Sequence, residues 1–144
     1  MSGRSALFVA VQVAAVAYLL FTGPILPTQA LPAVVELLGI AVAVWGIAVL
    51  RVRNLNIAPE VRQGGMLVTS GPYHYVRHPM YSGLLLVCLM WIVEAFSWWR
   101  LAAWAVLAGD ILMKMRYEEG RLLAAFPDYE SYRKRTKRLI PFLY

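Results

Sequence analysis

The sequence predicts an all-α protein, namely an integral membrane bundle of four transmembrane helices followed by a cytoplasmic C-terminal amphipathic helix. Hydrophobic residues make up 60% of the 144 residues, and the mean hydropathy is +0.60, which exceeds that of ordinary soluble domains. Four apolar stretches recur along the chain, and lysine and arginine are concentrated in alternate connections between them. We expect one domain over residues 1–144.

The four transmembrane helices are expected at about residues 5–22, 31–51, 79–96 and 100–117. A helix needs about 20 apolar residues to cross the hydrocarbon core of a bilayer, with a range of about 17–25. The second stretch meets this length without help, and the first and third lie near the lower limit. The fourth reaches it only with its polar inner end, so we expect its last turns at the interface. The first segment lacks the small-residue cleavage pattern of a signal peptide.

Two features of the apolar stretches are expected to serve packing. Gly39, Ala43 and Gly46 follow one another at steps of four and three. They therefore share one face of the second helix, where small residues let helices approach closely. The single cysteine, Cys88, lies inside an apolar run. It cannot form an intramolecular disulfide, and we expect it in the core.

The distribution of charge predicts the topology. The chain carries 14 lysines and arginines and a net charge of +6, and with four crossings every one of these cations except Arg100 falls on the same side. The positive-inside rule places that side, with both termini, in the cytoplasm. The frequent use of alanine and arginine suggests a bacterial source, and the expected location is then the bacterial inner membrane. Basic residues beside a bilayer meet anionic headgroups, so membrane lipids are expected partners and nucleic acid is not. The sequence leaves the oligomeric state open.

The connection between the second and third helices concentrates polar and rigid residues. Residues 71–83 contain three tyrosines, both histidines, one arginine and two prolines. We expect His78-Pro79 to open the third helix, because proline suits the first helical position. The free amides and the positive end of the helix dipole would then favour a ligand carboxylate at this end. The alternative is that His78 only caps the helix.

The fourth helix carries a second group of polar residues. Asp110, Lys114 and Glu118 are spaced by four, so they share one face. Ionisable residues inside a membrane span are functional candidates by default. The alternative is an ion-pair ladder among the three that lets the helix end emerge into water, and whether Asp110 is structural or functional stays open. The neighbouring Glu119 is expected to supply surface charge.

The segment over residues 118–138 is expected to form the cytoplasmic amphipathic helix, broken near Pro127. Its lysines and arginines would form one side, and such a helix lies in the headgroup plane and anchors the chain. The other side is apolar and consists of Leu122, Leu123, Phe126, Tyr129 and Tyr132.

Several motifs together resemble one family. They occur in order along about residues 51–141, in two blocks separated by one helical hairpin. The first block comprises Leu67-Val68-Thr69-Ser70-Gly71-Pro72-Tyr73 and Val76-Arg77-His78-Pro79-Met80-Tyr81-Ser82-Gly83. The second comprises Glu118-Glu119, Phe126, Tyr129, Tyr132 and Ile140-Pro141. This pattern resembles the isoprenylcysteine carboxyl methyltransferase and phospholipid methyltransferase superfamily of integral membrane enzymes.

The resemblance implies that S-adenosylmethionine binds at the cytoplasmic ends of the helices. Lys114 occupies the position of a family arginine that faces the substrate carboxylate, one turn before the cofactor glutamate. Lysine keeps the charge but lacks the bidentate geometry of arginine. Lys114 and Glu118 are accordingly the catalytic candidates, Lys114 also contacts the substrate, and no metal is expected. The residues implied to line the cofactor pocket are Tyr73, His78, Pro79, Met80, Tyr81 and Glu118, closed by the backbone of Gly65, Met66, Leu67 and Val68.

The activity expected from this resemblance is methyl transfer from S-adenosylmethionine to a lipophilic or lipid-modified acceptor, of the isoprenylcysteine carboxyl methyltransferase type. Alternatives within the superfamily are N-methylation of a phospholipid amine and methylation of a thiol. Two other classes stay open. Sterol-type reductases that use NADPH tend to have Asn-Tyr after His-Pro, where this chain has Met80-Tyr81. A non-catalytic membrane protein is less consistent with the presence of Tyr73, His78 and Glu118.

Overall fold

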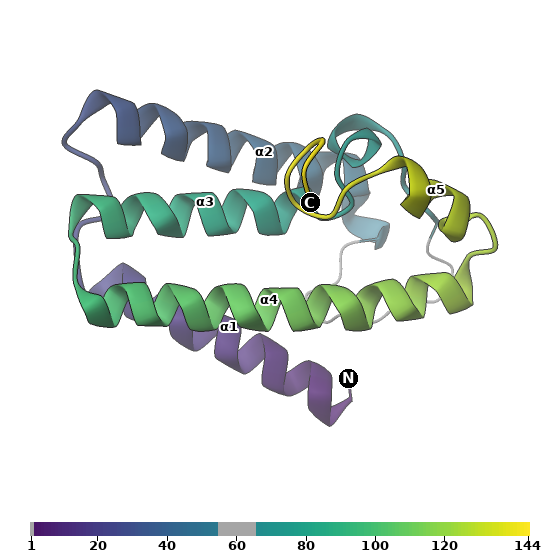
Figure 1. Cartoon of the computed structure of the whole chain (residues 1–144), viewed down its shortest axis with the longest axis horizontal. Coiled ribbons are helices and arrows are strands. Elements are labelled where there is room, and N and C mark those ends of the chain that lie inside the picture. Colours follow the sequence, from purple (N-terminus) through teal and green to yellow (C-terminus); the bar gives the residue numbers. More distant parts are fainter. Residues whose placement is uncertain (1, 55–65) are drawn as a thin grey trace.

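The structure, a computed structural model, describes residues 2–54 and 66–144, with only the backbone at residues 51–54. The all-α class is confirmed, since these residues form no strand and contain only an isolated bridge between Val76 and Lys137. Figure 1 shows the arrangement of the helices. Their bounds are α1 (Gly3–Phe21), α2 (Ala30–Asn54), the 3-10 helix η1 (Gly71–His74), α3 (Pro79–Glu94), α4 (Trp98–Ala125) and α5 (Tyr129–Arg135).

Two of the helices in the described residues are long and apolar enough to cross a bilayer. They are α1 and the Ala30–Leu50 part of α2. The α3 helix is apolar but has 16 residues, which is just below the usual spanning length. The four-span bundle and its orientation therefore stay predictions. In the fold, the N-terminus, the start of α3 and α5 lie at one end of the bundle (Figure 1).

The end of α4 differs from the prediction. We expected the fourth helix to stop near residue 117 and a new helix to begin at residue 118. Instead α4 continues without interruption to Ala125, and the short α5 begins only at Tyr129. The reason is local, because residues 114–125 are mostly good helix formers and no strong breaker follows until Pro127. The predicted break near Pro127 is thus confirmed.

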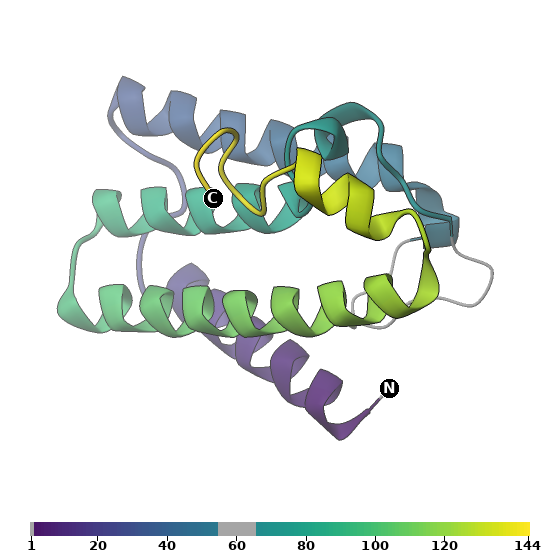
Figure 2. The same ribbon diagram turned by 45° about the vertical axis from the view of Figure 1, so that its right-hand side comes forward.

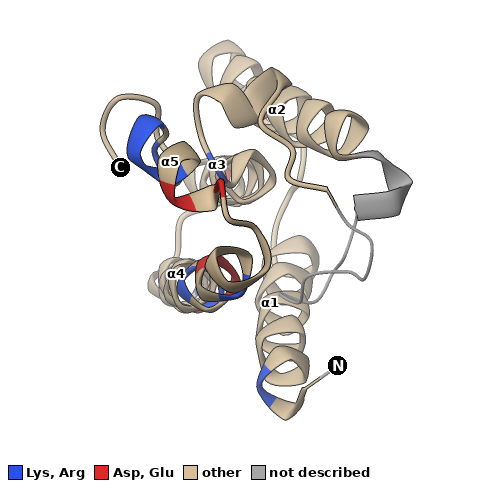
Figure 3. Cartoon of the chain, turned by 90° about the vertical axis from the view of Figure 1, so that its right-hand side faces the viewer, with Lys and Arg blue, Asp and Glu red and all other residues tan. Residues whose placement is uncertain are grey.

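The helices pack as two pairs, with α2 along α3 and α1 along α4 (Figure 3). The predicted small-residue face of α2 forms the first contact. A Cβ atom added at Gly83 would lie 2.8 Å from the Cβ of Ala43 and still closer to the carbonyl oxygen of Gly39. One added at Gly46 would lie 3.2 Å from Cγ of Pro79. The backbones of α2 and α3 are therefore in direct contact beside the start of α3.

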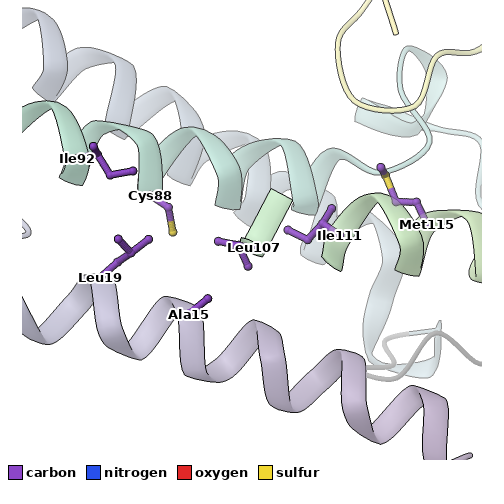
Figure 4. Packing of buried hydrophobic residues seen from close by; sticks show 7 residues of the cluster. All are labelled: Ala15, Leu19, Cys88, Ile92, Leu107, Ile111 and Met115. Carbon is purple, nitrogen blue, oxygen red and sulfur yellow. The ribbon is translucent and has the colours of Figure 1, made fainter. Parts of the chain in front are cut away.

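The apolar core lies between α1, α3 and α4 (Figure 4). Cys88 has no exposed surface, which confirms its predicted packing role. Each large apolar side chain buried in this way contributes about 1.5–3 kcal/mol relative to an exposed one. The cluster consists of Ala15, Leu19, Cys88, Ile92, Leu107, Ile111 and Met115.

Arg100 joins three helices at the other end of the bundle. Its side chain is buried, and its guanidinium donates hydrogen bonds to the carbonyl of Leu19 (3.0 Å), the hydroxyl of Thr22 (2.8 Å) and the carbonyl of Trp91 (2.7 Å). These acceptors lie at the C-terminal ends of α1 and α3, where the helix dipole favours a cation. Arg100 thereby fixes the start of α4 against both helices.

We predict that Gly83→Ala destabilises the protein and that Gly109→Ala does not. Both glycines lie inside helices, where alanine gains about 1 kcal/mol in helix propensity. A Cβ at Gly83 collides with α2, and overpacking of this kind costs about 1–3 kcal/mol, whereas a Cβ at Gly109 meets nothing within 4 Å. Thermal unfolding in detergent should show a lower midpoint for Gly83→Ala and an unchanged or higher one for Gly109→Ala. Equal shifts would contradict the close contact.

Candidate functional site

The candidate site lies where α3 begins, between the later turns of α4 and the segment after α5 (Figure 2). The hydroxyl of Tyr81 donates a hydrogen bond to Oε2 of Glu118 at 3.2 Å. The ring of His78 stacks on the ring of Tyr81, with centroids 5.6 Å apart and an interplanar angle of 17°. Residues predicted for the site on α3 and on α4, about forty positions apart in sequence, therefore meet in the fold.

Glu119 is buried rather than exposed, which corrects the expectation that it only supplies surface charge. Its Oε1 atom lies 2.8 Å from Nε of Arg77 and 3.4 Å from Nε2 of His78. Its Oε2 atom lies 3.0 Å from the guanidinium of Arg138. One carboxylate thus joins the segment before α3, α4 and the segment after α5. A buried carboxylate is costly unless it is paired in this way.

The pairing shifts the ionisation of Glu119. Burial alone would raise the pKa of this carboxyl, but its hydrogen bonds with His78, Arg138 and Arg77 outweigh burial and bring the pKa down to about 2. The folded state therefore favours the ionised form. Its contribution to stability is complete above the ordinary carboxyl pKa of 4.5 and is lost as the pH falls toward 2.

The start of α3 is covered by backbone from the C-terminal side. The amide of Arg77 donates to the carbonyl of Lys137 at 2.8 Å, and the amide of His78 donates to the carbonyl of Arg138 at 3.0 Å. His78 occupies the N-cap position, but its side chain makes no capping hydrogen bond and turns to Glu119 instead. The amides expected to be free for a ligand are thus partly used by the chain itself.

Two buried tyrosine hydroxyls at the site have no hydrogen-bond partner among the described residues. They belong to Tyr73 on η1 and Tyr129 on α5. Burial, and then the nearby charge of Glu118, raises the pKa of Tyr73, and burial likewise raises the pKa of Tyr129. Both hydroxyls therefore stay protonated. A buried hydroxyl without a partner costs free energy, so these two atoms can donate to a polar ligand.

Lys114 lies on α4 one turn before Glu118 and is 1% exposed. Its ammonium donates a hydrogen bond to Oε1 of Gln12 on α1 at 2.8 Å and lies 5.3 Å from the ring centroid of Tyr81. Within the described residues Lys114 forms no ion pair, so the ladder with Asp110 and Glu118 is not formed. Asp110 is also buried, and one of its oxygens has no hydrogen-bond partner in the same part of the chain.

The remaining residues predicted to form the cofactor pocket have other surroundings. Pro79 and Met80 pack against Gly46 of α2, with their Cγ atoms 3.2 and 3.1 Å from a Cβ built there. Met66 is 70% exposed, while Leu67 and Val68 are half-buried. Gly65 lies outside the described residues. The pocket roles of these six positions stay predictions.

The sequence alone did not reveal Gln12 and Arg138. Gln12 is a polar side chain inside the apolar first helix, and such residues are unusual enough in a membrane span to be a usable signal. Arg138 belongs to a run of cations that reads as solvated surface. No signal in the sequence separates it from its neighbours. The described residues contain no group of three or more histidine, cysteine, aspartate or glutamate side chains arranged to hold a metal ion.

Comparison with known proteins gives one family and two curated relatives. A sequence model of the phospholipid methyltransferase family matches residues 27–128. A methanethiol S-methyltransferase of Crocosphaera subtropica is 38% identical over 72 residues, which cover 49% of this chain and 28% of the relative. The cobalt-zinc-cadmium resistance protein CzcN of Cupriavidus metallidurans is 38% identical over 86 residues, 57% of this chain and 38% of the relative. The chain thus spans well under half the length of either relative.

We predict that Glu119→Gln lowers the free energy of unfolding by about 3–5 kcal/mol near neutral pH, because the change leaves the largely buried guanidinium of Arg77 and the half-buried one of Arg138 without a carboxylate. Glu130→Gln is the matched control. Glu130 pairs with Arg133 and Lys134 on the exposed face of α5, and such pairs contribute about 0–1 kcal/mol. Unfolding in detergent should be followed from pH 7 to pH 2. The difference between wild type and Glu119→Gln should shrink below pH 4.5, and a constant difference would contradict the lowered pKa.

Proposed function

The chain belongs to the phospholipid methyltransferase family, and from this premise we propose that it transfers a methyl group from S-adenosylmethionine to a lipophilic, anionic acceptor. The observation that carries the acceptor class is Lys114. Its ammonium is buried one helical turn before Glu118 and forms no direct ion pair with a carboxylate of the described residues. The site would face the cytoplasm, where the polar cofactor is available, and the acceptor would enter from the bilayer.

The described residues fit the proposed cofactor chemically. S-adenosylmethionine carries hydroxyls, an amino group and a carboxylate, and when bound it supplies an electrophilic methyl group on a sulfonium sulfur. Glu118 offers a carboxylate for the amino or hydroxyl groups. Tyr73 and Tyr129 offer buried hydroxyls that lack partners in the described part of the chain. These three residues, with the stacked rings of His78 and Tyr81, are the ones we propose to hold the cofactor.

Lys114 favours an acceptor that is negatively charged. A buried ammonium that forms no direct ion pair stabilises an anion brought beside it and disfavours a protonated amine. Gln12 holds the ammonium by accepting one hydrogen bond and leaves its other two protons for a ligand. An acceptor anion at this position needs no general base, so alignment of acceptor and donor would supply most of the catalysis.

Among anionic acceptors, we propose a thiolate first and a carboxylate second. An ammonium is a compact point charge, which matches the single sulfur atom of a thiolate, whereas a carboxylate is matched better by the fork of arginine. The relative from Crocosphaera subtropica is named for methylation of a thiol, which supports the same order. A carboxylate acceptor would correspond to the isoprenylcysteine carboxyl methyltransferase type. N-methylation of a phospholipid amine is the third possibility, and the buried cation disfavours it.

Family membership also bears on the other classes of function. It favours methyl transfer over an NADPH-dependent reductase. The unpartnered hydroxyls, the Tyr81–Glu118 hydrogen bond and the buried ammonium form a set of polar groups that a purely structural protein would not require. We therefore propose an enzyme rather than a non-catalytic membrane protein.

We predict that Glu118→Gln and Lys114→Met affect different steps. Loss of a charged hydrogen bond costs about 1.5–3 kcal/mol, so Glu118→Gln should weaken binding of S-adenosylhomocysteine by roughly ten- to a hundredfold. Lys114→Met should leave that affinity nearly unchanged and reduce turnover. Arg116→Met, an exposed position on the same helix, is the control and should change neither. Calorimetric titration of the purified protein measures the affinities, and an unaltered affinity in Glu118→Gln would refute its cofactor role.

The acceptor class is tested with three substrates presented in the same detergent: a long-chain alkanethiol, a prenylated cysteine with a free carboxylate, and phosphatidylethanolamine. We predict methyl transfer to the thiol at the highest rate, and strong dependence of that rate on Lys114. Activity with phosphatidylethanolamine alone would contradict the anionic acceptor while leaving the cofactor proposal intact. Binding of NADPH without binding of S-adenosylhomocysteine would overturn the proposed function as a whole.

A further inference from the structure

A cavity lined mainly by cationic residues lies on the C-terminal side of Glu119 and its partners. Its volume is about 460 Å³, and none of the residues predicted to hold the cofactor lines it. It is therefore separate from the proposed methyl-transfer site. Five of its eight lining residues are cations, namely Arg77, Arg133, Lys134, Lys137 and Arg138.

The cations of this cavity exceed the carboxylates that neutralise them. Arg77 and Arg138 share one partner, Glu119. Arg133 and Lys134 share another, Glu130, at 3.5 and 3.7 Å on the exposed surface, where ion pairs are weak. Lys137 forms no ion pair with any described residue. Five cationic side chains thus face two anionic ones, and no aspartate or glutamate side chain lines the cavity itself. A cavity with this charge is suited to a phosphate group.

An exposed apolar turn adjoins the cavity. The amides of Leu139 and Ile140 both donate to the main-chain oxygen of Tyr144 at 2.8 Å, which closes the turn. Phe142 at its tip has a φ of 66° and is 88% exposed, and Leu143, which also lines the cavity, is 76% exposed. Large apolar side chains held out in this way indicate a surface that meets a partner or a membrane.

The turn lies beside the first turn of α3. The hydroxyl of Ser82 donates to the carbonyl of Leu139 at 2.6 Å, and Figures 1 and 2 both show the C-terminal segment folded back along the start of α3. The α3 helix becomes continuously apolar from this level onward. The apolar turn is therefore at the depth where that helix would enter the bilayer, with the cationic cavity next to it on the polar side.

We propose that this cavity binds the phosphate group of an anionic phospholipid while the turn around Phe142 inserts into the acyl boundary. Cations beside an apolar insertion are the combination that holds protein segments at anionic membrane surfaces. The lipid is a bound ligand here and not the methyl acceptor. Its effect would be to hold the segment that covers the start of α3 against the membrane. The proposal does not depend on which acceptor is methylated.

The test uses the intact purified protein and native mass spectrometry with added phosphatidylglycerol or phosphatidylcholine. We expect phosphatidylglycerol to bind at least about tenfold more tightly. Lys137→Gln should weaken it about fivefold, the equivalent of about 1 kcal/mol for one cation at an anionic surface. Arg135→Gln is the matched control, because it removes an equal charge from the neighbouring α5 position that does not line the cavity. It should have little effect.

Two further measurements distinguish binding of a phospholipid from binding of inorganic phosphate. Phe142→Ser should weaken phosphatidylglycerol binding, and millimolar inorganic phosphate should displace the lipid poorly, because it lacks the acyl chains. Three results would overturn the proposal: equal binding of the two lipids, equal losses in Lys137→Gln and Arg135→Gln, or full displacement by inorganic phosphate. Because Lys137 and Phe142 are exposed, these variants should fold, and unchanged thermal unfolding confirms that the losses concern the site.

Discussion

The arrangement of the site depends on one buried carboxylate. Glu119 is 2% exposed and is held between Arg77, His78 and Arg138, which come from before, at and far after the start of α3. An ion in such surroundings is tolerated only when its partners stay in place, because each partner lost leaves an unpaired buried charge. This requirement sets where His78 points and where the C-terminal segment lies. The position of the neighbouring Tyr81–Glu118 hydrogen bond depends on it in turn.

The contrast between Glu119 and Lys114 separates a charge that holds the fold together from one that we propose to act on the acceptor. Both are almost fully buried and both lie on α4. Glu119 has all of its charge compensated by neighbouring cations, so it needs nothing further. Lys114 has one neutral acceptor and one aromatic ring in direct contact, and among the described residues it forms no direct ion pair, with the charges of Asp110 and Glu118 acting on it only from a greater distance. The two residues are buried to the same extent, so burial does not distinguish their roles. Their hydrogen-bond and ion-pair partners do.

Much of the fold was predictable from sequence, because apolar length and small-residue spacing are local properties. The helices, the close-packing face of α2 and the core position of Cys88 followed from these patterns. The meeting of Tyr81 with Glu118 followed from the family resemblance. Gln12 could not be placed beside Lys114, since hydropathy does not say which helices pair. The prediction that Glu119 only supplies surface charge was wrong. Adjacent helical residues point about 100° apart, and which of them faces inward depends on the packing of the whole chain.

The covering of α3 by the C-terminal segment also determines when the site can exist. The backbone of residues 77 and 78 is bonded to residues 137 and 138, and the Arg77–Thr136 contact spans 59 positions. A chain emerging from the ribosome presents α1 to α4 first, and its domains form from the N-terminal side. Every described helix and every residue predicted to bind the cofactor has been synthesised before residues 136–138, which make these contacts, appear. The nascent protein therefore passes through a stage in which its described helices have all been synthesised while the proposed site is still unassembled.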